Sequence, residues 1–186
     1  VINIITKKGK KAGNSVYGVG SIGTYDTYKG TVGISSQVDN FSYNVAFTQA
    51  KTGGISEAVM PEGTSSMFEK DGHKTGAVNA NFSLQASKNL SVSPFLRYFY
   101  GHYDFDANGF EDNLENNYKL KYFSGGVNTK YEFKGGKLTF NYSYENASTD
   151  SRSQYGESNS EGKMQLVDLF YNRRVGDKVH LLVGLD

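Results

Sequence analysis

Long stretches of the chain alternate apolar and polar residues with a period of two. The alternation is clearest in residues 41–48, 78–85 and 138–145, where Phe, Tyr, Val, Ala or Leu takes every second position and Asn, Ser or Thr fills most positions between. Successive side chains of a β-strand point to opposite faces of a sheet. The period therefore predicts an all-β chain whose strands have one apolar and one polar face.

The same pattern predicts about nine strands in all, with little room for helix. The others lie near residues 14–25, 27–37, 90–103, 117–133, 163–174 and 177–185. At most a helical turn is expected in segments 65–70 and 111–116. Several runs are longer than the roughly 5–6 residues typical of soluble proteins. They match the roughly 9–11 residues that a tilted membrane-spanning strand needs.

Composition supports strands and narrows the classes of function. The 186 residues include 14 Tyr and 12 Phe, which suit strands, but 2 Pro and no Cys. Disulfides and thiolate metal sites are therefore excluded. A formal net charge of +1 gives no electrostatic basis for binding nucleic acid. The mean hydropathy of −0.54 argues against a helical membrane protein, but it suits barrel strands whose two faces average to a polar value.

The connections between the predicted strands alternate in length. Short turns are expected at 37–40, 87–89, 134–137 and 175–178, and long polar loops at 51–74, 104–116 and 148–162. The first hairpin, around residues 25–28, is the exception because it is also short. Short turns at one end and long loops at the other are typical of outer-membrane barrels, whose turns lie in the periplasm.

A soluble antiparallel sheet would also alternate if one face packed on a core. However, the polar positions are rich in Asn, Ser, Thr and Gly rather than the Lys and Glu expected on a solvated surface. Aromatic residues also gather near the predicted strand ends, as at Tyr98–Tyr103 and Tyr131–Phe133, which fits the interfacial girdles of membrane barrels. The sequence therefore favours an antiparallel transmembrane β-barrel.

The opening segment Val1–Gly9, VINIITKKG, resembles the last plug-domain strand of TonB-dependent receptors, where it leads into the first barrel strand. Segments Ser21–Tyr25 and Phe41–Asn44 are similar to early barrel strands of that family. Within the family, the pattern is most similar to cobalamin receptors. On this resemblance, residues 1–11 are the end of the plug and its linker, and residues 12–186 are the N-terminal part of the barrel.

The resemblance implies a non-enzymatic transporter in the outer membrane of a Gram-negative bacterium. It would take up a scarce, bulky ligand such as cobalamin, powered through TonB. The implied partners are outer-membrane lipid, the plug of the same full-length chain, TonB through the missing N-terminal part, and a bulky small-molecule ligand. About nine strands cannot close a barrel of the roughly 22 strands of this class, so a partial barrel is expected.

The segment 104–115 matches the calcium-loop pattern D-x-[DN]-x-[DN]-G-x5-E. Its candidate calcium ligands are Asp104, Asp106, Asn108, Asp112 and Glu115. Alternate oxygen side chains would converge on the ion, and Gly109 permits the sharp turn. No helices are predicted to flank the loop, and a solvated external loop explains the same residues. No cofactor is required, and calcium is the one candidate ion.

Other polar residues give no convincing constellation. His73, His102 and His180 share no metal-ligand spacing, and Arg97 and Asp168 are expected to face the lumen. Three alternatives to a cobalamin transporter stay open. They are a siderophore, haem or glycan receptor of the same family, an outer-membrane barrel enzyme, for which His102 with Asp104 is a loose candidate, and a soluble β-rich binding module.

Overall fold

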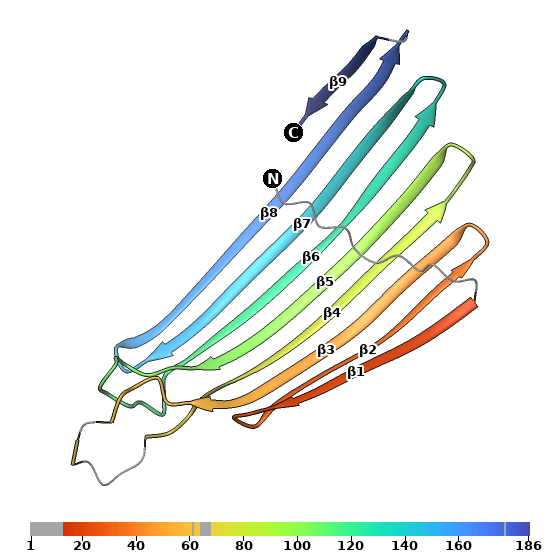
Figure 1. The fold of residues 1–186 in the computed structure, drawn as a ribbon. Coiled ribbons are helices and arrows are strands. Elements are labelled where there is room, and N and C mark those ends of the chain that lie inside the picture. Colours follow the sequence, from red (N-terminus) through yellow and green to blue (C-terminus); the bar gives the residue numbers. More distant parts are fainter. Residues whose placement is uncertain (1–12, 61, 64–67, 177) are drawn as a thin grey trace.

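The computed structural model describes residues 13–60, 62–63, 68–176 and 178–186. These residues form a nine-stranded antiparallel sheet in which each strand pairs with the next one along the chain (Figure 1). The strands are β1 (Gly13–Gly23), β2 (Thr27–Val38), β3 (Phe41–Ile55), β4 (Asp71–Gln85), β5 (Leu90–Asp104), β6 (Asn117–Phe133), β7 (Gly136–Ser153), β8 (Gly156–Val175) and β9 (Val179–Leu185). The sheet is open, with β1 and β9 at its edges, and the all-β prediction is confirmed.

The hydrogen-bond register divides the side chains into two faces. Val45 of β3 lies opposite Ile34 of β2 and Ala80 of β4, and Ala80 lies opposite Leu96 of β5. Paired residues project to the same side of a sheet, so these rows share one side, which we call the apolar face. It also carries Val16, Val32, Phe47, Val78, Phe82, Tyr98, Phe123, Val127, Phe140, Tyr142, Val167 and Leu169.

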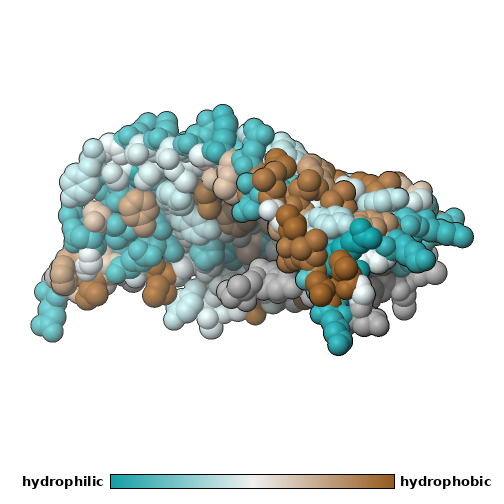
Figure 2. Space-filling model, turned by 90° about the horizontal axis from the view of Figure 1, so that it is seen from above, coloured by the Kyte–Doolittle hydropathy of each residue, from teal (hydrophilic) through white to brown (hydrophobic). Residues whose placement is uncertain are grey.

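The apolar face is exposed rather than packed. Val16 is 78% exposed, Ile22 81% and Val167 50%. Among the described residues, the buried hydrophobic side chains are Ala58 and Ala80 alone. Figure 2 shows apolar residues gathered in brown patches on the surface of the molecule. An exposed apolar surface of this extent marks a contact with lipid or with another protein.

The opposite side, the polar face, carries small polar side chains that bond across strands. Ser93 donates to Ser83 at 3.1 Å. Across β6, β7 and β8, Asn128 donates to Asn141, and the Asn141 amide donates to Asp168 Oδ2 at 3.4 Å. These bonds satisfy polar groups that face the same side of the sheet.

The strand ends differ from the predicted connections in one place. Long connections join β3 to β4, over residues 56–70, and β5 to β6, over residues 105–116. The third predicted loop, 148–162, is wrong, because β7 and β8 continue as a paired hairpin as far as Ser153 and Gly156.

Two smaller expectations concern helix and the start of the chain. Residues 68–70 form no turn, whereas segment 111–116 forms a single turn at 114–115, in which the Asn116 amide donates to the Asn113 carbonyl at 3.4 Å. The described residues also contain no helix that is long and apolar enough to cross a membrane. The expected plug strand and linker, residues 1–11, lie outside the described residues.

The strand pairing at the end of β3 is irregular around Gly54. The pairing of β3 with β4 shifts between Thr52 and Ile55. Gly54 has a φ of +68°, and a Cβ built on it would lie 1.9 Å from the Asp71 carbonyl oxygen. Only glycine fits both the positive φ and this close backbone approach. The irregularity therefore sets how the end of β3 meets Asp71 at the start of β4.

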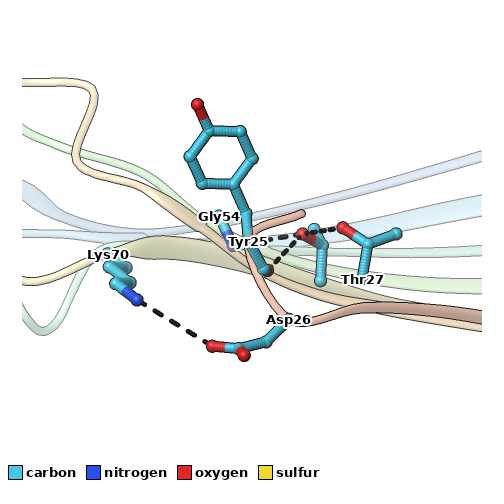
Figure 3. A network of polar contacts seen from close by, with 6 residues as sticks. Tyr25, Asp26, Thr27, Gly54 and Lys70 are labelled. Carbon is cyan, nitrogen blue, oxygen red and sulfur yellow. Dashed lines mark hydrogen bonds and ion pairs between the residues drawn. The ribbon is translucent and has the colours of Figure 1, made fainter. Parts of the chain in front are cut away.

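The β1–β2 hairpin is fixed to the same end of β3. Its tip residues Tyr25 and Asp26 have positive φ values of 59° and 53°. The Tyr25 carbonyl accepts hydrogen bonds from the Gly53 amide at 2.8 Å and from Thr52 Oγ1 at 3.1 Å. Lys70 Nζ lies 3.9 Å from Asp26 Oδ2 (Figure 3). Because this ion pair is exposed, the bonds to the Tyr25 carbonyl hold the tip more firmly.

Replacing Gly54 with Ala should destabilise the protein, because the new Cβ meets the Asp71 carbonyl and the residue must keep a positive φ. We expect a loss of about 2 kcal/mol or more, measured by thermal unfolding followed by circular dichroism. Gly76→Ala on β4 is the matched control, because a Cβ at Gly76 meets nothing within 4 Å. Equal stability of the two variants would contradict the proposed constraint at Gly54.

Candidate functional site

The two long connections meet at one end of the sheet. The Val59 amide donates to the Gly109 carbonyl at 2.8 Å, which joins the β3–β4 connection to the β5–β6 connection. Ser56 Oγ lies 3.3 Å from Asp106 Oδ2 and adds a second link. The buried side chain of Ala58 lies in the same segment. Residues more than 40 positions apart in sequence are therefore held together outside the strands.

A carboxylate cluster lies where these connections meet. One oxygen each of Glu69, Asp106 and Asp112 lies within 4.8 Å of the other two. Asp71, at the loop end of β4, lies beside Asp106. Four backbone amides donate to these carboxylates: Ala58 N and Asn113 N to Asp106 at 2.6 and 3.2 Å, Glu57 N to Asp71 at 2.6 Å, and Glu69 N to Asp112 at 3.2 Å.

Several oxygens of the cluster are buried without a hydrogen-bond partner. They are Glu69 Oε2, Asp71 Oδ1 and Asp112 Oδ1, each with almost no exposure to solvent. Burying a carboxylate oxygen is costly unless a proton or a cation compensates it. Convergent carboxylate oxygens are the ligands that calcium prefers, since this ion takes 6–8 oxygens in flexible geometry. The donor set therefore fits a divalent, oxygen-preferring cation.

Burial and mutual repulsion perturb the acidity of the cluster. Burial raises the pKa of Glu69 to about 7, helped by its contact with Asp112 and by the negative charge there. Burial also raises the pKa of Asp71 to about 6. The hydrogen bond from the Glu57 amide acts to lower this pKa, and the neighbouring Asp106 acts to raise it further. At Asp106 burial acts to raise the pKa, but the amides of Ala58 and Asn113 outweigh it and hold that pKa below its ordinary value.

The structure brings together two of the five residues predicted from the calcium-loop pattern. Asp106 and Asp112 belong to the cluster. Asp104 Oδ1 instead lies 3.3 Å from His102 Nε2. Asn108 donates to Glu111 Oε2 at 2.9 Å, and Glu115 is exposed. Calcium binding itself stays a prediction.

The sequence pattern did not include Glu69 and Asp71. They belong to the β3–β4 connection and the start of β4, outside the twelve-residue pattern. Their only sequence signal is two acidic residues placed just before and at the start of a strand. Nothing local indicates that this strand end lies beside residues 106 and 112.

The other polar residues considered in the sequence analysis lie apart from the carboxylate cluster. Arg97 lies 5.0 Å over the Phe95 ring on the polar face. The His73 ring lies 5.5 Å from the Tyr103 ring, and the Tyr103 ring lies 6.2 Å from that of Tyr118, with the rings tilted against each other. These three rings form an aromatic row on the polar face near the long connections. His102 and Asp104 approach each other, but among the described residues no serine or threonine hydroxyl bonds to either, so they do not form a nucleophile–base set.

One solved structure places the sheet in a known architecture. A mutant of the ferric enterobactin receptor from Pseudomonas aeruginosa superimposes with a TM-score of 0.59 at 13% sequence identity. The match covers 94% of this chain and 31% of that receptor, so the chain spans about a third of the receptor's length. The nine-stranded sheet therefore matches part of a TonB-dependent receptor barrel. Neither the scan of protein-family models nor the search of curated proteins found a match.

Without divalent cations, the end of the sheet where the β3–β4 and β5–β6 connections meet (the loop end) should lose stability as the pH rises. Glu69 and Asp71 have raised pKa values in the folded state, so they favour folding while protonated and oppose it once ionised. We expect protease cleavage within 105–116 to accelerate as the pH rises from about 4 to about 7, the window between the ordinary pKa values of these carboxyl groups and their raised values of about 6 and about 7. In Glu69→Gln this dependence should be weaker. A cleavage rate that does not change with pH in the wild-type protein would contradict the assignment.

Proposed function

We propose that the chain forms part of the barrel wall of a TonB-dependent transporter in the outer membrane of a Gram-negative bacterium. The observation that carries the proposal is the exposed apolar face of a sheet that matches a receptor barrel. In a bilayer that face contacts lipid and the polar face lines the lumen, as in other membrane barrels. The likeness to an outer-membrane receptor supports this location.

The topology follows from the lengths of the connections. The turns at residues 39–40, 86–89 and 134–135 lie at one end of the sheet, and the connections 56–70 and 105–116 lie at the other. In outer-membrane barrels the short turns are periplasmic and the long loops are extracellular. The carboxylate cluster would therefore stand at the outer mouth. Among the described residues the outer edges of β1 and β9 are unpaired, so a barrel built from this sheet would need further strands, because unsatisfied backbone groups are not tolerated in lipid.

Transport rather than catalysis is proposed for the whole protein. The polar face offers side chains that could contact the plug or a ligand, including the Asn128–Asn141–Asp168 chain and the aromatic row. Energy would come through TonB, acting on the plug. A soluble binding module would have to cover the exposed apolar face, whereas a barrel places it in lipid without any further partner.

Within this function, the carboxylate cluster is proposed to bind calcium and so hold the two connections together. The ion would neutralise Glu69, Asp106 and Asp112, whose crowded charges otherwise repel each other. It would supply the partner that the buried Glu69 Oε2 and Asp112 Oδ1 need. The binding surface at the mouth would then be ordered before the ligand arrives.

Calcium should stabilise the protein through this cluster. At about 100 times its Kd the ion should raise the unfolding free energy by about 2.7 kcal/mol. Asp106→Asn should abolish the effect in calcium-dependent melting, because it removes a carboxylate at the centre of the cluster. Glu115→Gln is the matched control, because Glu115 is exposed and outside the cluster. Loss of the calcium effect in both variants would favour the ligand set of the sequence pattern, which includes Asp106 and Glu115, whereas loss in Glu115→Gln alone would contradict the cluster.

The ligand is proposed to be bulky, with cobalamin as the first candidate and a ferric siderophore as the second. The second is suggested by the likeness to a ferric enterobactin receptor. We expect isothermal titration of the detergent-solubilised full-length protein to show tight binding of one of them, weakened when calcium is chelated. Binding of cobalamin alone would support the first candidate, and binding of ferric enterobactin alone the second. If neither bound, both ligand assignments would be contradicted, while the barrel assignment would stand on its own evidence.

A further inference from the structure

A row of basic side chains crosses four strands on the apolar face, at its loop end. The register pairs Lys51 of β3 with Lys74 of β4, Lys74 with His102 of β5, and His102 with Lys119 of β6. Directly paired residues project to the same side of a sheet, so these four side chains form one continuous line. We call it the basic row.

The basic row directly borders the apolar face. On β4 the same-face side chains pass from Val78 through Gly76 to Lys74, and on β5 from Tyr98 through Tyr100 to His102. On β6 they pass from Phe123 to Lys121 and then Lys119; residue 121 adds a further cation just inside the row. Under the proposed topology, this change of chemistry marks the boundary between the outer leaflet and the external water. A lysine there can lay its alkyl stem along apolar surface and raise its ammonium group to the headgroups.

The lysines of the row, Lys51, Lys74 and Lys119, have no acidic ion-pair partner in the part of the chain that the structure describes. Like charges directly opposite each other destabilise a sheet, because their Cβ atoms are only about 4.5–5.5 Å apart. The pairing of Lys51 with Lys74 is such a case. A partner with negative charge would turn this unfavourable arrangement into a favourable one.

The acidic residues bordering the row leave most of its charge free. Asp104 follows His102 on the same strand and approaches it at 3.3 Å. Asp150 of β7 is paired with Lys119, although no ion pair joins them among the described contacts. Both carboxylates lie at the β5–β7 side of the row. At the β3 side, Asp26 lies beside Gly53 and forms an ion pair with Lys70 at 3.9 Å. The Lys51–Lys74 pair therefore faces outward without an acidic cross-strand neighbour.

We infer that the basic row binds the phosphate groups of phosphorylated lipids in the outer leaflet, with their acyl chains against the apolar face. The inference rests on the proposed membrane location. Four neighbouring strands span about 14 Å at roughly 4.8 Å per strand, enough for more than one phosphate. A lipid, unlike free phosphate, gains both the charge contacts of the row and burial of its chains on the adjoining apolar surface. The row would act as a headgroup site that fixes the height of the barrel in the membrane.

The test is lipid binding by the detergent-solubilised full-length protein, stripped of bound lipid and measured by native mass spectrometry. The probes are lipid A with two phosphates, lipid A from which both phosphates have been removed, and inorganic phosphate as competitor. Lys74→Gln combined with Lys119→Gln should weaken binding of the diphosphorylated lipid about thirtyfold, since each lysine near anionic headgroups contributes roughly fivefold. Lys88→Gln combined with Lys134→Gln removes the same charge from the opposite turns and should leave binding unchanged.

Three outcomes would overturn the inference. They are equal binding of phosphorylated and dephosphorylated lipid, equal loss in the two double variants, and displacement of the lipid by millimolar inorganic phosphate alone. These outcomes differ from failure of the proposed function. A protein that neither enters bilayers nor retains any lipid would contradict the membrane location itself, whereas a membrane-inserted barrel without headgroup preference would contradict only the basic row.

Discussion

The antiparallel hydrogen-bond register is the constraint on which the rest of this structure depends. Each strand pairs with the next, from β1 to β9, so every side chain is assigned to a face by its pairing. A slip of one residue in any pair would exchange the apolar and polar faces of that strand. The same register sets the Lys51–Lys74–His102–Lys119 row, the aromatic row and the asparagine chain on the polar face. Surface chemistry is therefore a direct consequence of strand alignment.

At the loop end the structure depends on charged side chains rather than on apolar surface. Backbone amides hold Asp106 and Asp71 in place, while Glu69 and Asp112 crowd against them. Burial of Glu69, followed by its contact with Asp112 and the negative charge there, raises the pKa of Glu69 to about 7. Gly54 matters to this arrangement although it carries no side chain, because it lets β3 pass close to the Asp71 backbone. The cluster and the register are thus linked through one glycine.

The strands and their faces could be predicted from the sequence, because a local period of two specifies them. Contacts between residues far apart in the sequence could not. The alternation at 41–48 places β3 and its faces, because the apolar–polar period repeats through these residues of the strand. It missed the extension of β7 and β8 through 148–162, since both faces are polar there and no alternation remains. The calcium-loop pattern found Asp106 and Asp112, which are six residues apart, but not Glu69, which reaches them only through tertiary folding.

The central claim is that one face of this sheet contacts lipid and the other lines a water-filled or plugged interior. The chain has no cysteine, so single cysteines can carry a spin label at chosen positions of β3 without removing native ones. With the full-length protein in bilayers, labels at residues 43–48 can be tested for contact with oxygen, which is enriched in lipid, and with a water-soluble nickel complex. The account predicts that oxygen contact peaks at 43, 45 and 47 and falls at 44, 46 and 48. Equal access of the nickel complex to all six positions would contradict it.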